Sequence, residues 1–233
     1  MTASIYDISK TFKPFAYPGK LITVVGFDGS GKTTQLDLLE RTLQQEGHTV
    51  HNWKQPTDWY RGLGGVKVFH NEGGSATQAK VLSLLAAADR QKHVEEEILP
   101  ALRQGHVVLV DRYVYATFGV FVHRGVDLDF LININAGIPK PDLAFYLRLT
   151  PQQLASRLKA RDGDNLQFEE RDLSRVASII STYEKMPQEL ISIDGSRSVN
   201  DVAAEVNSHI NKSCSGFRRN LADFAQSGAQ KPI

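Results

Sequence analysis

The stretch VVGFDGSGKTTQ, residues 24–35, decides the fold. Within it, Gly26, Gly31, Lys32 and Thr33 satisfy the pattern G-x-x-x-x-G-K-[ST], which lies between an apolar run and a helical segment. The glycines let successive backbone N–H groups turn inward toward a phosphate, and the start of the helix adds positive potential. Lys32 can reach the β- and γ-phosphates, and the Thr33 hydroxyl can ligate Mg²⁺. The stretch therefore predicts a site for a nucleoside triphosphate.

Short apolar runs recur along the chain, separated by longer helical stretches. The runs are LITVVG at 21–26, TVHNWK at 49–54, HVVLVD at 106–111, LAFYLRL at 143–149 and ELISID at 189–194. They show little strict alternation of apolar and polar residues, which is typical of strands buried on both faces of a parallel sheet. The helical stretches between them would cover both faces. The order predicts an α/β fold with a doubly wound parallel sheet.

Three helical stretches carry signals for their ends. The stretch after the phosphate loop closes with Gly47, a C-cap residue. Residues 76–105 form a long stretch in which Pro100 either kinks the helix or starts a new one. A later helix begins with Thr150 as N-cap and Pro151 at the first helical position.

The composition fits one globular domain and argues against several classes of protein. The 233 residues are 41% hydrophobic and 23% charged, which fits neither a disordered chain nor a membrane protein. A formal charge of +1 argues against binding to nucleic acid, because no long excess of Lys and Arg can displace its counterions. The single cysteine, Cys214, cannot form an internal disulfide, and residues 1–20 lack the apolar core of a signal peptide. We therefore expect a cytoplasmic location.

Guanine specificity is not indicated. A GTP switch needs N-K-x-D, and the Asn-Lys pair of this chain, at 211–212, is followed by Ser213 and Cys214. ATP is therefore the expected nucleotide. The phosphate loop alone leaves open an ATP-dependent phosphotransferase or a mechanical or regulatory ATPase.

The segment HVVLVDRYVYATFGVF, residues 106–121, supplies a second set of charged candidates. Asp111 follows a buried strand at its carboxyl end, where open α/β sheets bind ligands. It can hold Mg²⁺ through water, and Arg112 beside it can grip an acceptor phosphate with two parallel N–H bonds. The two residues predict the second half of a phosphoryl-transfer site.

Two other charged segments have open roles. In LLAAADRQKH the pair Asp89-Arg90 interrupts a nearly apolar helical face, so Arg90 either caps a buried surface or points into a pocket. The charged, glycine-containing segment 159–172 is either a solvated loop or a lid that closes over ATP and brings an arginine to the transferred group. The phosphate loop favours the lid.

These segments together resemble the thymidylate kinase family of P-loop nucleoside monophosphate kinases. GFDGSGKTTQ, LLAAADRQKH, VDRYVYATFG and PKPDLAFYLRLTPQQLASRLKARDG with FEERD occur in the family's order, over about residues 20–210. The resemblance implies a P-loop NTPase fold with a five-stranded core and a short lid. It also implies ATP, Mg²⁺, a homodimer and phosphorylation of a deoxynucleoside monophosphate, dTMP before others.

The resemblance also assigns roles to the acceptor side. Asp28 matches the loop acid that approaches the sugar and phosphate of the acceptor. Arg112 matches the arginine that binds the acceptor phosphate, and Arg90 matches the arginine that reaches the pyrimidine base. Lys54 and Pro56, in KQPTDWYR, occupy the place of the family's Arg-Glu-Pro loop.

On the donor side, the phosphate-loop residue Ser30 is uncharged, so the resemblance moves the transition-state cation to the lid. Arg161 is the expected residue, with Arg157 and Arg171 as alternatives. The expected catalytic set is thus Lys32, Arg112 and Arg161, with Thr33 and Asp111 at the metal. The expected ATP-binding residues are Gly26, Phe27, Asp28, Gly29, Ser30, Gly31, Lys32, Thr33 and Thr34.

The chain departs from the family at the base of the acceptor. Many members have Phe where this chain has Ala86, so the surface that stacks on thymine is missing there. Either Trp59, Tyr60 or Tyr115 replaces that surface, or small residues such as Ala86 and Gly119 enlarge the pocket for a different or modified nucleotide. A non-catalytic ATP-binding regulatory module is the alternative from another class.

The chain divides into three parts on this interpretation. We expect an N-terminal extension at 1–19, the kinase domain at 20–212 with its lid at about 158–172, and a C-terminal tail at 213–233.

Overall fold

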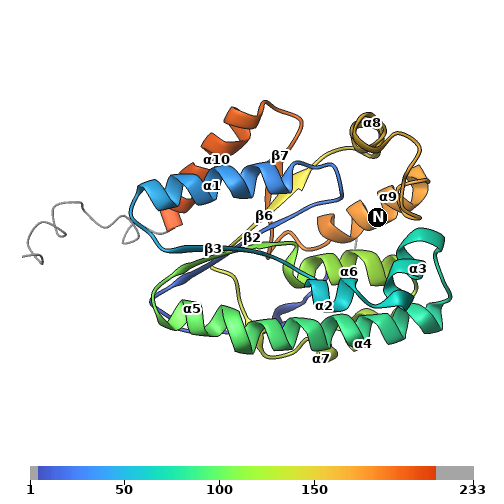
Figure 1. Ribbon diagram of the computed structural model, residues 1–233, viewed down its shortest axis with the longest axis horizontal. Coiled ribbons are helices and arrows are strands. Elements are labelled where there is room, and N and C mark those ends of the chain that lie inside the picture. The colour runs from blue at the N-terminus through green and yellow to red at the C-terminus, as the bar shows by residue number, and fades with distance from the viewer. Residues whose placement is uncertain (1–4, 214–233) are drawn as a thin grey trace, which may run out of the picture.

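The computed structural model describes residues 5–213, and a parallel five-stranded sheet runs through its centre (Figure 1). Its strand order is β3-β4-β2-β6-β7. The strands are β2 (Lys20–Val25), β3 (Val50–Lys54), β4 (Val107–Asp111), β6 (Leu143–Arg148) and β7 (Ile191–Asp194). The predicted fold class is confirmed, and each apolar run became a strand within two residues of its predicted start.

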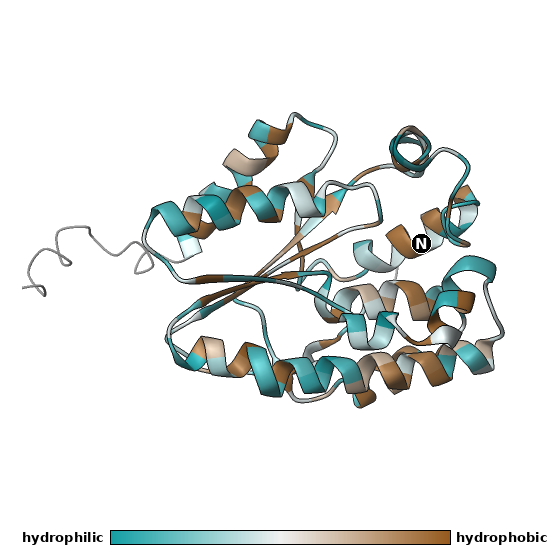
Figure 2. Cartoon of the chain, viewed as in Figure 1, coloured by the Kyte–Doolittle hydropathy of each residue, from teal (hydrophilic) through white to brown (hydrophobic). Residues whose placement is uncertain are grey.

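Helices cover both faces of the sheet. One face carries α1 (Lys32–Gln45) and α10 (Val199–Ser213), as Figure 1 shows. The remaining helices are α2 (Asp58–Arg61), α3 (Gly64–Glu72), α4 (Ala76–His93), α5 (Leu99–Arg103), α6 (Tyr113–His123), α7 (Leu128–Ile134), α8 (Pro151–Asp162) and α9 (Leu173–Glu184). Figure 2 shows hydrophobic stretches on these helices alternating with hydrophilic ones. Two buried clusters result, a small one beneath α1 and α10 and a larger one on the opposite face.

The stretch predicted at 76–105 is helical almost throughout but is not one regular α-helix. Between α4 and α5 lies η2 (Val94–Ile98), a π-helical turn, and Pro100 stands in the first turn of α5. Proline cannot donate to the preceding turn, and the wider π turn absorbs the resulting change in the helical ladder. The predicted start of α8 is confirmed, because Thr150 caps it in a reciprocal capping box with Gln153.

The chain before the sheet also has regular structure. The 3₁₀ turn η1 (Ser9–Thr11) leads into β1 (Phe12–Lys13), which pairs in parallel with β5 (Ile138–Pro139) in a separate two-stranded sheet. Part of the segment predicted as an N-terminal extension is therefore packed on the domain. The predicted tail lies outside the described residues from 214 onward, and Cys214 with it.

The strand order places the phosphate loop beside Asp111. β2 is the central strand, and the register pairs Val24 with Asp111 of β4. Parallel strands end at the same edge of a sheet, so the loop after β2 and the segment after β4 meet there. Within residues 5–213, no helix has both the length and the apolar character needed to cross a membrane.

Candidate active site

The phosphate loop joins β2 to α1 in the conformation that its glycines predict. Gly26, Gly29 and Gly31 have φ values of 151°, 81° and 97°, in the region that side chains with a Cβ avoid. A Cβ on Gly26 would also lie 2.6 Å from Ser30 Oγ. Glycine at position 26 is therefore required by both the backbone angle and the close approach of Ser30.

The loop is suited to hold a triphosphate. Lys32 is buried in the first turn of α1, and its Nζ donates to Phe27 O at 3.0 Å and lies 3.5 Å from Asp28 Oδ1. Burial, followed by the neighbouring Arg112, lowers the pKa of Lys32. Ser30 Oγ is buried and has no hydrogen-bond partner among the described residues. A phosphate in the loop would satisfy both groups.

Oxygen donors suited to Mg²⁺ meet beside the loop. Thr33 and Asp111 both border a cavity of about 220 Å³ between α1 and the ends of β3 and β4, together with Asp37 and Asn52. Asp111 Oδ1 is buried and has no partner within residues 5–213. Hydroxyl and carboxylate oxygens are the ligands that Mg²⁺ takes up, so these residues fit the metal.

Arg112 and Tyr113 turn the chain sharply after β4. Their φ values are 85° and 51°, unusual for residues other than glycine, and Arg112 N donates to Val24 O at 2.9 Å. The turn directs the Arg112 guanidinium to Asp28, with which it forms an ion pair. Burial alone would raise the pKa of Asp28, but Arg112 and Lys32 hold it well below its usual range. Asp28 is therefore ionised and lies between the two cations.

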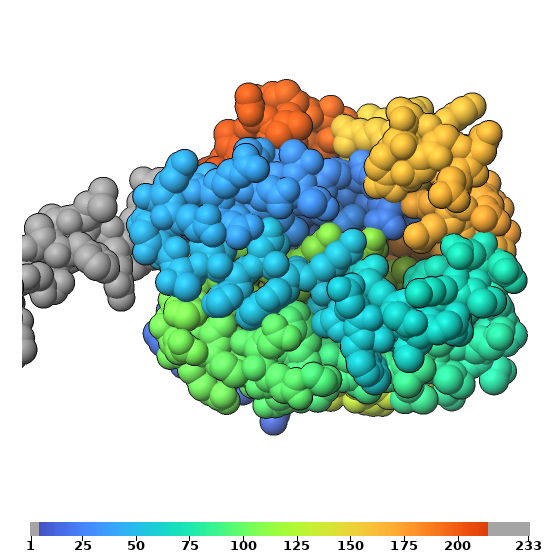
Figure 3. Space-filling model, viewed as in Figure 1, coloured from blue at the N-terminus to red at the C-terminus, as the bar shows by residue number. Residues whose placement is uncertain are grey.

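A larger cavity, of about 480 Å³, opens next to this ion pair. In the space-filling view, the surface is hollowed between the phosphate loop, α3 and the orange segment that includes α9 (Figure 3). The lining residues are Phe27, Asp28, Lys54, Pro56, Tyr60, Arg61, Val66, Lys67, His70, Asn71, Arg112, Ala116, Thr117, Val120, Phe121, Arg161, Gln167, Glu169, Glu170, Ile179 and Tyr183. The volume suits a small organic ligand such as a nucleotide.

Among the cations that line this cavity, Lys54, Arg61 and Arg112 lie close enough together for their charges to interact. Burial and the charge of Arg112 lower the pKa values of Lys54 and Arg61. Arg61 Nε donates to Pro56 O at 2.6 Å, which fixes the guanidinium and leaves its remaining N–H groups for other partners. Cations held this close together favour a multiply charged anion such as a phosphate.

Arg61 was missed by the sequence analysis, although it ends the quoted segment KQPTDWYR. Its position depends on α2, which brings it back over Pro56. The helix has a recognisable start, because Thr57 accepts a hydrogen bond from Trp59 N as its N-cap. Thr57 as an N-cap would have predicted a short helix beginning at Asp58, and that helix would have placed Arg61 near Pro56.

Asp89 and His93 hold the loop that carries Lys54 and Pro56. Asp89 accepts hydrogen bonds from Thr57 N, at 2.8 Å, and from the Thr57 hydroxyl. His93 Nδ1 and Gln55 Nε2 form a hydrogen bond of 3.0 Å. Asp89 therefore anchors the loop that carries Lys54 and Pro56.

Arg90 is not at the cavity surface. Its side chain is only 1% exposed and donates to Asn135 Oδ1 at 2.9 Å and to Thr117 Oγ1 at 2.5 Å. Thr117 does line the cavity. In this arrangement Arg90 lies behind Thr117 and positions it at the cavity wall. The contact of Arg90 with a base stays a prediction of the resemblance.

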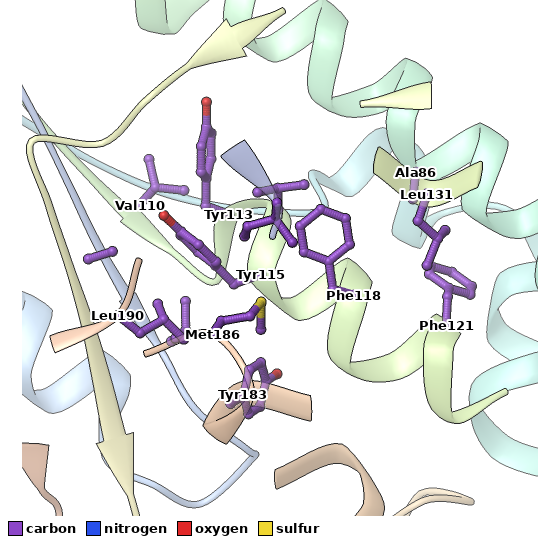
Figure 4. Packing of buried hydrophobic residues seen from close by; sticks show 14 of the residues in the cluster. Ala86, Val110, Tyr113, Tyr115, Phe118, Phe121, Leu131, Tyr183, Met186 and Leu190 are labelled. Carbon is purple, nitrogen blue, oxygen red and sulfur yellow. The ribbon is translucent and has the colours of Figure 1, made fainter. Parts of the chain in front are cut away.

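The two small residues do not enlarge the cavity. Ala86 is buried in the larger hydrophobic cluster with Phe121 and Leu131 (Figure 4) and is not part of the cavity wall. A Cβ on Gly119 would lie 3.0 Å from the Tyr183 ring, so that ring fills the space a side chain would occupy. Of the two alternatives left open by the sequence, an enlargement by these two residues is therefore not seen, because Ala86 lies away from the cavity wall and the Tyr183 ring occupies the space beside Gly119.

Aromatic surface remains available from other elements. Of the three residues proposed to replace the lost stacking surface, Tyr60 lines the cavity, whereas Tyr115 is buried and Trp59 is half exposed on α2. Phe121 lines the cavity from α6. The cavity thus presents aromatic side chains from α2 and α6.

The three lid arginines have different surroundings. Arg161 lines the cavity and pairs with Asp162. Arg157 donates to Gly195 O at 2.9 Å and lies beside Gly29 of the phosphate loop. Arg171 is exposed and donates to Leu166 O at 2.8 Å. Arg161 is the lid arginine that the structure brings to the cavity wall.

The segment predicted as a lid, about residues 158–172, is docked on α3 and on the C-cap of α6. Phe168 N donates to His70 O at 3.0 Å, and Glu169 forms a buried ion pair with Arg124. The Arg124 guanidinium also lies 4.4 Å from the ring centroid of Phe168 and 4.4 Å from that of Phe69. Burial raises the pKa of Glu170, which lines the cavity next to Glu169. No periodicity of the sequence indicated these contacts.

Comparisons with known proteins agree with this geometry. The family model described as "Thymidylate kinase" matches residues 24–206. The chain is 41% identical to a probable thymidylate kinase of Pyrococcus horikoshii over 146 residues, which are 61% of this chain and 71% of that protein. It is 33% identical to a thymidylate kinase of Caldicellulosiruptor saccharolyticus over 195 residues, which are 81% of this chain and 94% of that protein.

A solved structure supports the fold. The thymidylate kinase of Candida albicans, described as having broad substrate specificity, aligns with a TM-score of 0.66 at 22% identity. The alignment covers 85% of this chain and 95% of that one.

Proposed function

The chain belongs to the thymidylate kinase family, and from this premise we propose that it transfers the γ-phosphoryl group of ATP to dTMP, giving ADP and dTDP. One observation carries the proposal. The Asp28–Arg112 ion pair joins the phosphate loop to a cavity whose wall includes the cations Lys54 and Arg61. A donor loop and a phosphate-binding cavity are thus adjacent.

On the donor side, the loop amides, Lys32 and Ser30 Oγ would hold the phosphates of ATP. Thr33 and Asp111 would hold Mg²⁺, which neutralises charge on the phosphate oxygens. Lys32 is fixed by Phe27 O, so its charge is in place before the reaction and needs no reorganisation.

On the acceptor side, Arg112, Arg61 and Lys54 would bind the phosphate of dTMP. Arg112 is held by Asp28, and Arg61 by Pro56 O, so both guanidinium groups are oriented before the acceptor arrives. Tyr60, Val120 and Phe121 give the cavity an apolar part suited to a base, and Thr117 supplies a hydroxyl there. Asp28 would contact both the acceptor and the donor loop.

The lid completes the proposed site. Arg161 would place its charge on the transferred group, and residues 167–170 would separate the acceptor from bulk water. Catalysis then rests on positioning and charge neutralisation, without a covalent enzyme intermediate. A homodimer, which the family resemblance implies, a cytoplasmic location and the division at residues 20 and 212 remain part of the proposal.

A coupled assay of ADP release tests the proposal. The purified chain is given ATP and Mg²⁺ with dTMP, dUMP, dCMP, dGMP or dAMP, and ADP release with dTMP should exceed release without any acceptor. The Arg112→Met variant should lose the response to dTMP, whereas Arg171→Met, an exposed lid arginine outside the cavity wall, should keep it. ADP release that is the same with and without every acceptor would contradict the proposal and favour a non-catalytic ATP-binding module.

A further inference from the structure

The N-terminal strap, residues 5–13, is packed on the domain next to the start of α6. Ile8 is 1% exposed and belongs to the larger hydrophobic cluster, as does Phe12. Tyr6 N donates to Lys185 O at 2.8 Å, and Thr11 O accepts from Gly137 N at 3.0 Å. The strap is therefore held by both backbone pairing and burial of side chains.

A short chain of contacts leads from the strap to Tyr113. Phe12 and Lys13 of β1 pair with Ile138 and Pro139 of β5. The Tyr113 hydroxyl, itself buried, donates to Pro139 O at 2.8 Å. The strap thus holds β5, and β5 provides the hydrogen-bond acceptor for Tyr113.

A second contact joins the strap to the same turn of α6. The rings of Phe12 and Tyr115 lie with centroids 5.9 Å apart. Figure 4 shows Tyr113 and Tyr115 at the beginning of α6, with the Tyr113 ring pointing away from Met186 and Leu190, and all four residues belong to the larger cluster. Both tyrosines that follow Arg112 are therefore braced by packing, one of them directly against the strap.

The braced turn is strained. Positive φ values at Arg112 and Tyr113 are unfavourable for residues other than glycine, and they persist only when the surroundings enforce them. This backbone conformation directs the Arg112 guanidinium toward Asp28 and the large cavity. Without the brace, the turn would relax and Arg112 would lose its fixed direction.

We propose that the N-terminal strap is a positioning element for Arg112, acting through β5, Tyr113 and Tyr115. This inference rests on the proposed function, because Arg112 is there assigned to the acceptor phosphate. The strap touches neither substrate. It sets the affinity for the acceptor by enforcing the strained turn at residues 112–113. Its contact chain meets the phosphate loop at Asp28, and it includes neither the Lys32–Phe27 contact nor Ser30.

Two variants interrupt the contact chain at different points. Tyr113→Phe removes only the hydroxyl that donates to Pro139 O, and Ile8→Ala loosens the strap without substituting a residue of the turn. Ile210→Ala is the matched control, because Ile210 is equally buried but lies in the other hydrophobic cluster, on α10. It should lower the melting temperature without moving Arg112.

Steady-state kinetics and hydrogen exchange give the readouts. Tyr113→Phe should raise the KM for dTMP by roughly fivefold, as expected for the loss of one hydrogen bond, with the KM for ATP within about twofold of wild type. Ile8→Ala should change the two KM values in the same way, because it loosens the packing of the strap that holds β5. Amide exchange in a peptide covering residues 108–118 should be faster in both variants than in Ile210→Ala. The double variant should raise the KM by less than the product of the single effects, since both act through one chain of contacts.

The outcomes separate this inference from the proposed function. Absence of dTMP-dependent turnover in the wild type would refute the proposed function. The exchange rates at residues 108–118 alone would then show whether the strap enforces the turn. Unchanged exchange at residues 108–118 in both variants would overturn the strap's role. So would a KM for dTMP that stays at the wild-type value while the melting temperature falls as in Ile210→Ala.

Discussion

Replacing either member of the Arg124–Glu169 ion pair should undock the lid from α6. Arg124 Nε donates to Glu169 Oε1 at 2.8 Å, and the two side chains are 7% and 8% exposed. Removal of one partner leaves the other as an unpaired buried charge, which costs about 3–5 kcal/mol in such pairs. Arg124 also contacts the rings of Phe69 and Phe168, so its loss removes cation–π contacts as well.

The perturbation is best made as a double-mutant cycle. Arg124→Met and Glu169→Met each remove one charge and keep an apolar side chain of similar length, and the double variant removes both charges. Each single variant should lower the free energy of unfolding by about 3 kcal/mol or more, which for a chain of this size lowers the melting temperature by at least roughly 6 °C. The double variant should lose less than the sum, by about 2 kcal/mol, because no charge is left unpaired.

Urea unfolding followed by circular dichroism measures these differences. Arg171→Met is the control from the same lid, since Arg171 is exposed and should change stability by less than about 0.5 kcal/mol. Additive losses in the double variant, or single losses below about 1 kcal/mol, would refute the reasoning that this pair holds the lid.

Three further predictions concern the charged groups of the site and of its supporting loop. Lys32→Ala should lower kcat in the ADP-release assay by roughly 10²-fold or more, because a fixed charge at the reacting phosphates is lost. Near-normal turnover would show that Lys32 does not stabilise the transferred phosphoryl group. Arg61→Met should raise the KM for dTMP at least about tenfold with little change in the KM for ATP, and an equal rise in both would place Arg61 elsewhere than at the acceptor phosphate. Burial lowers the pKa of His93, so the unfolded chain binds the proton more readily and stability should fall as the pH drops below the ordinary histidine value of 6.5. In His93→Gln, the free energy of unfolding should depend less steeply on pH between about pH 7.5 and about pH 5.5. An unchanged pH dependence would mean that it arises from the other histidines with lowered pKa values, His51, His70 and His123.

Local signals were enough to predict the framework of the molecule. The phosphate loop has a fixed spacing, and the five apolar runs are short and continuous, so each could be identified without knowledge of distant residues. The position of Asp111 beside the loop then followed from the rule that parallel strands end at one edge. These features depend on the local sequence or on the topology of the sheet.

The acceptor side was harder to predict because it depends on packing between distant segments. Ala86 and Gly119 are small, and sequence alone suggested empty space where each lies. The structure places each of them in packed surroundings, Gly119 directly against Tyr183. Arg90 matches the family pattern, yet its environment of Asn135 and Thr117 is set by α6 and α7. A residue's type and spacing do not report which neighbour fills the adjoining volume.

The central position of β2 in the sheet limits where the ends of a fragment of this kinase can be placed. The segment recognised as the family domain begins at residue 24, within β2, and stops at 206, within α10. A fragment cut at those limits would lose most of its central strand, the strap that packs beside α6, and Ile210 of the smaller cluster. The span that identifies the family is thus shorter than the packed unit, and protein engineering on this chain should keep residues 5–213 together.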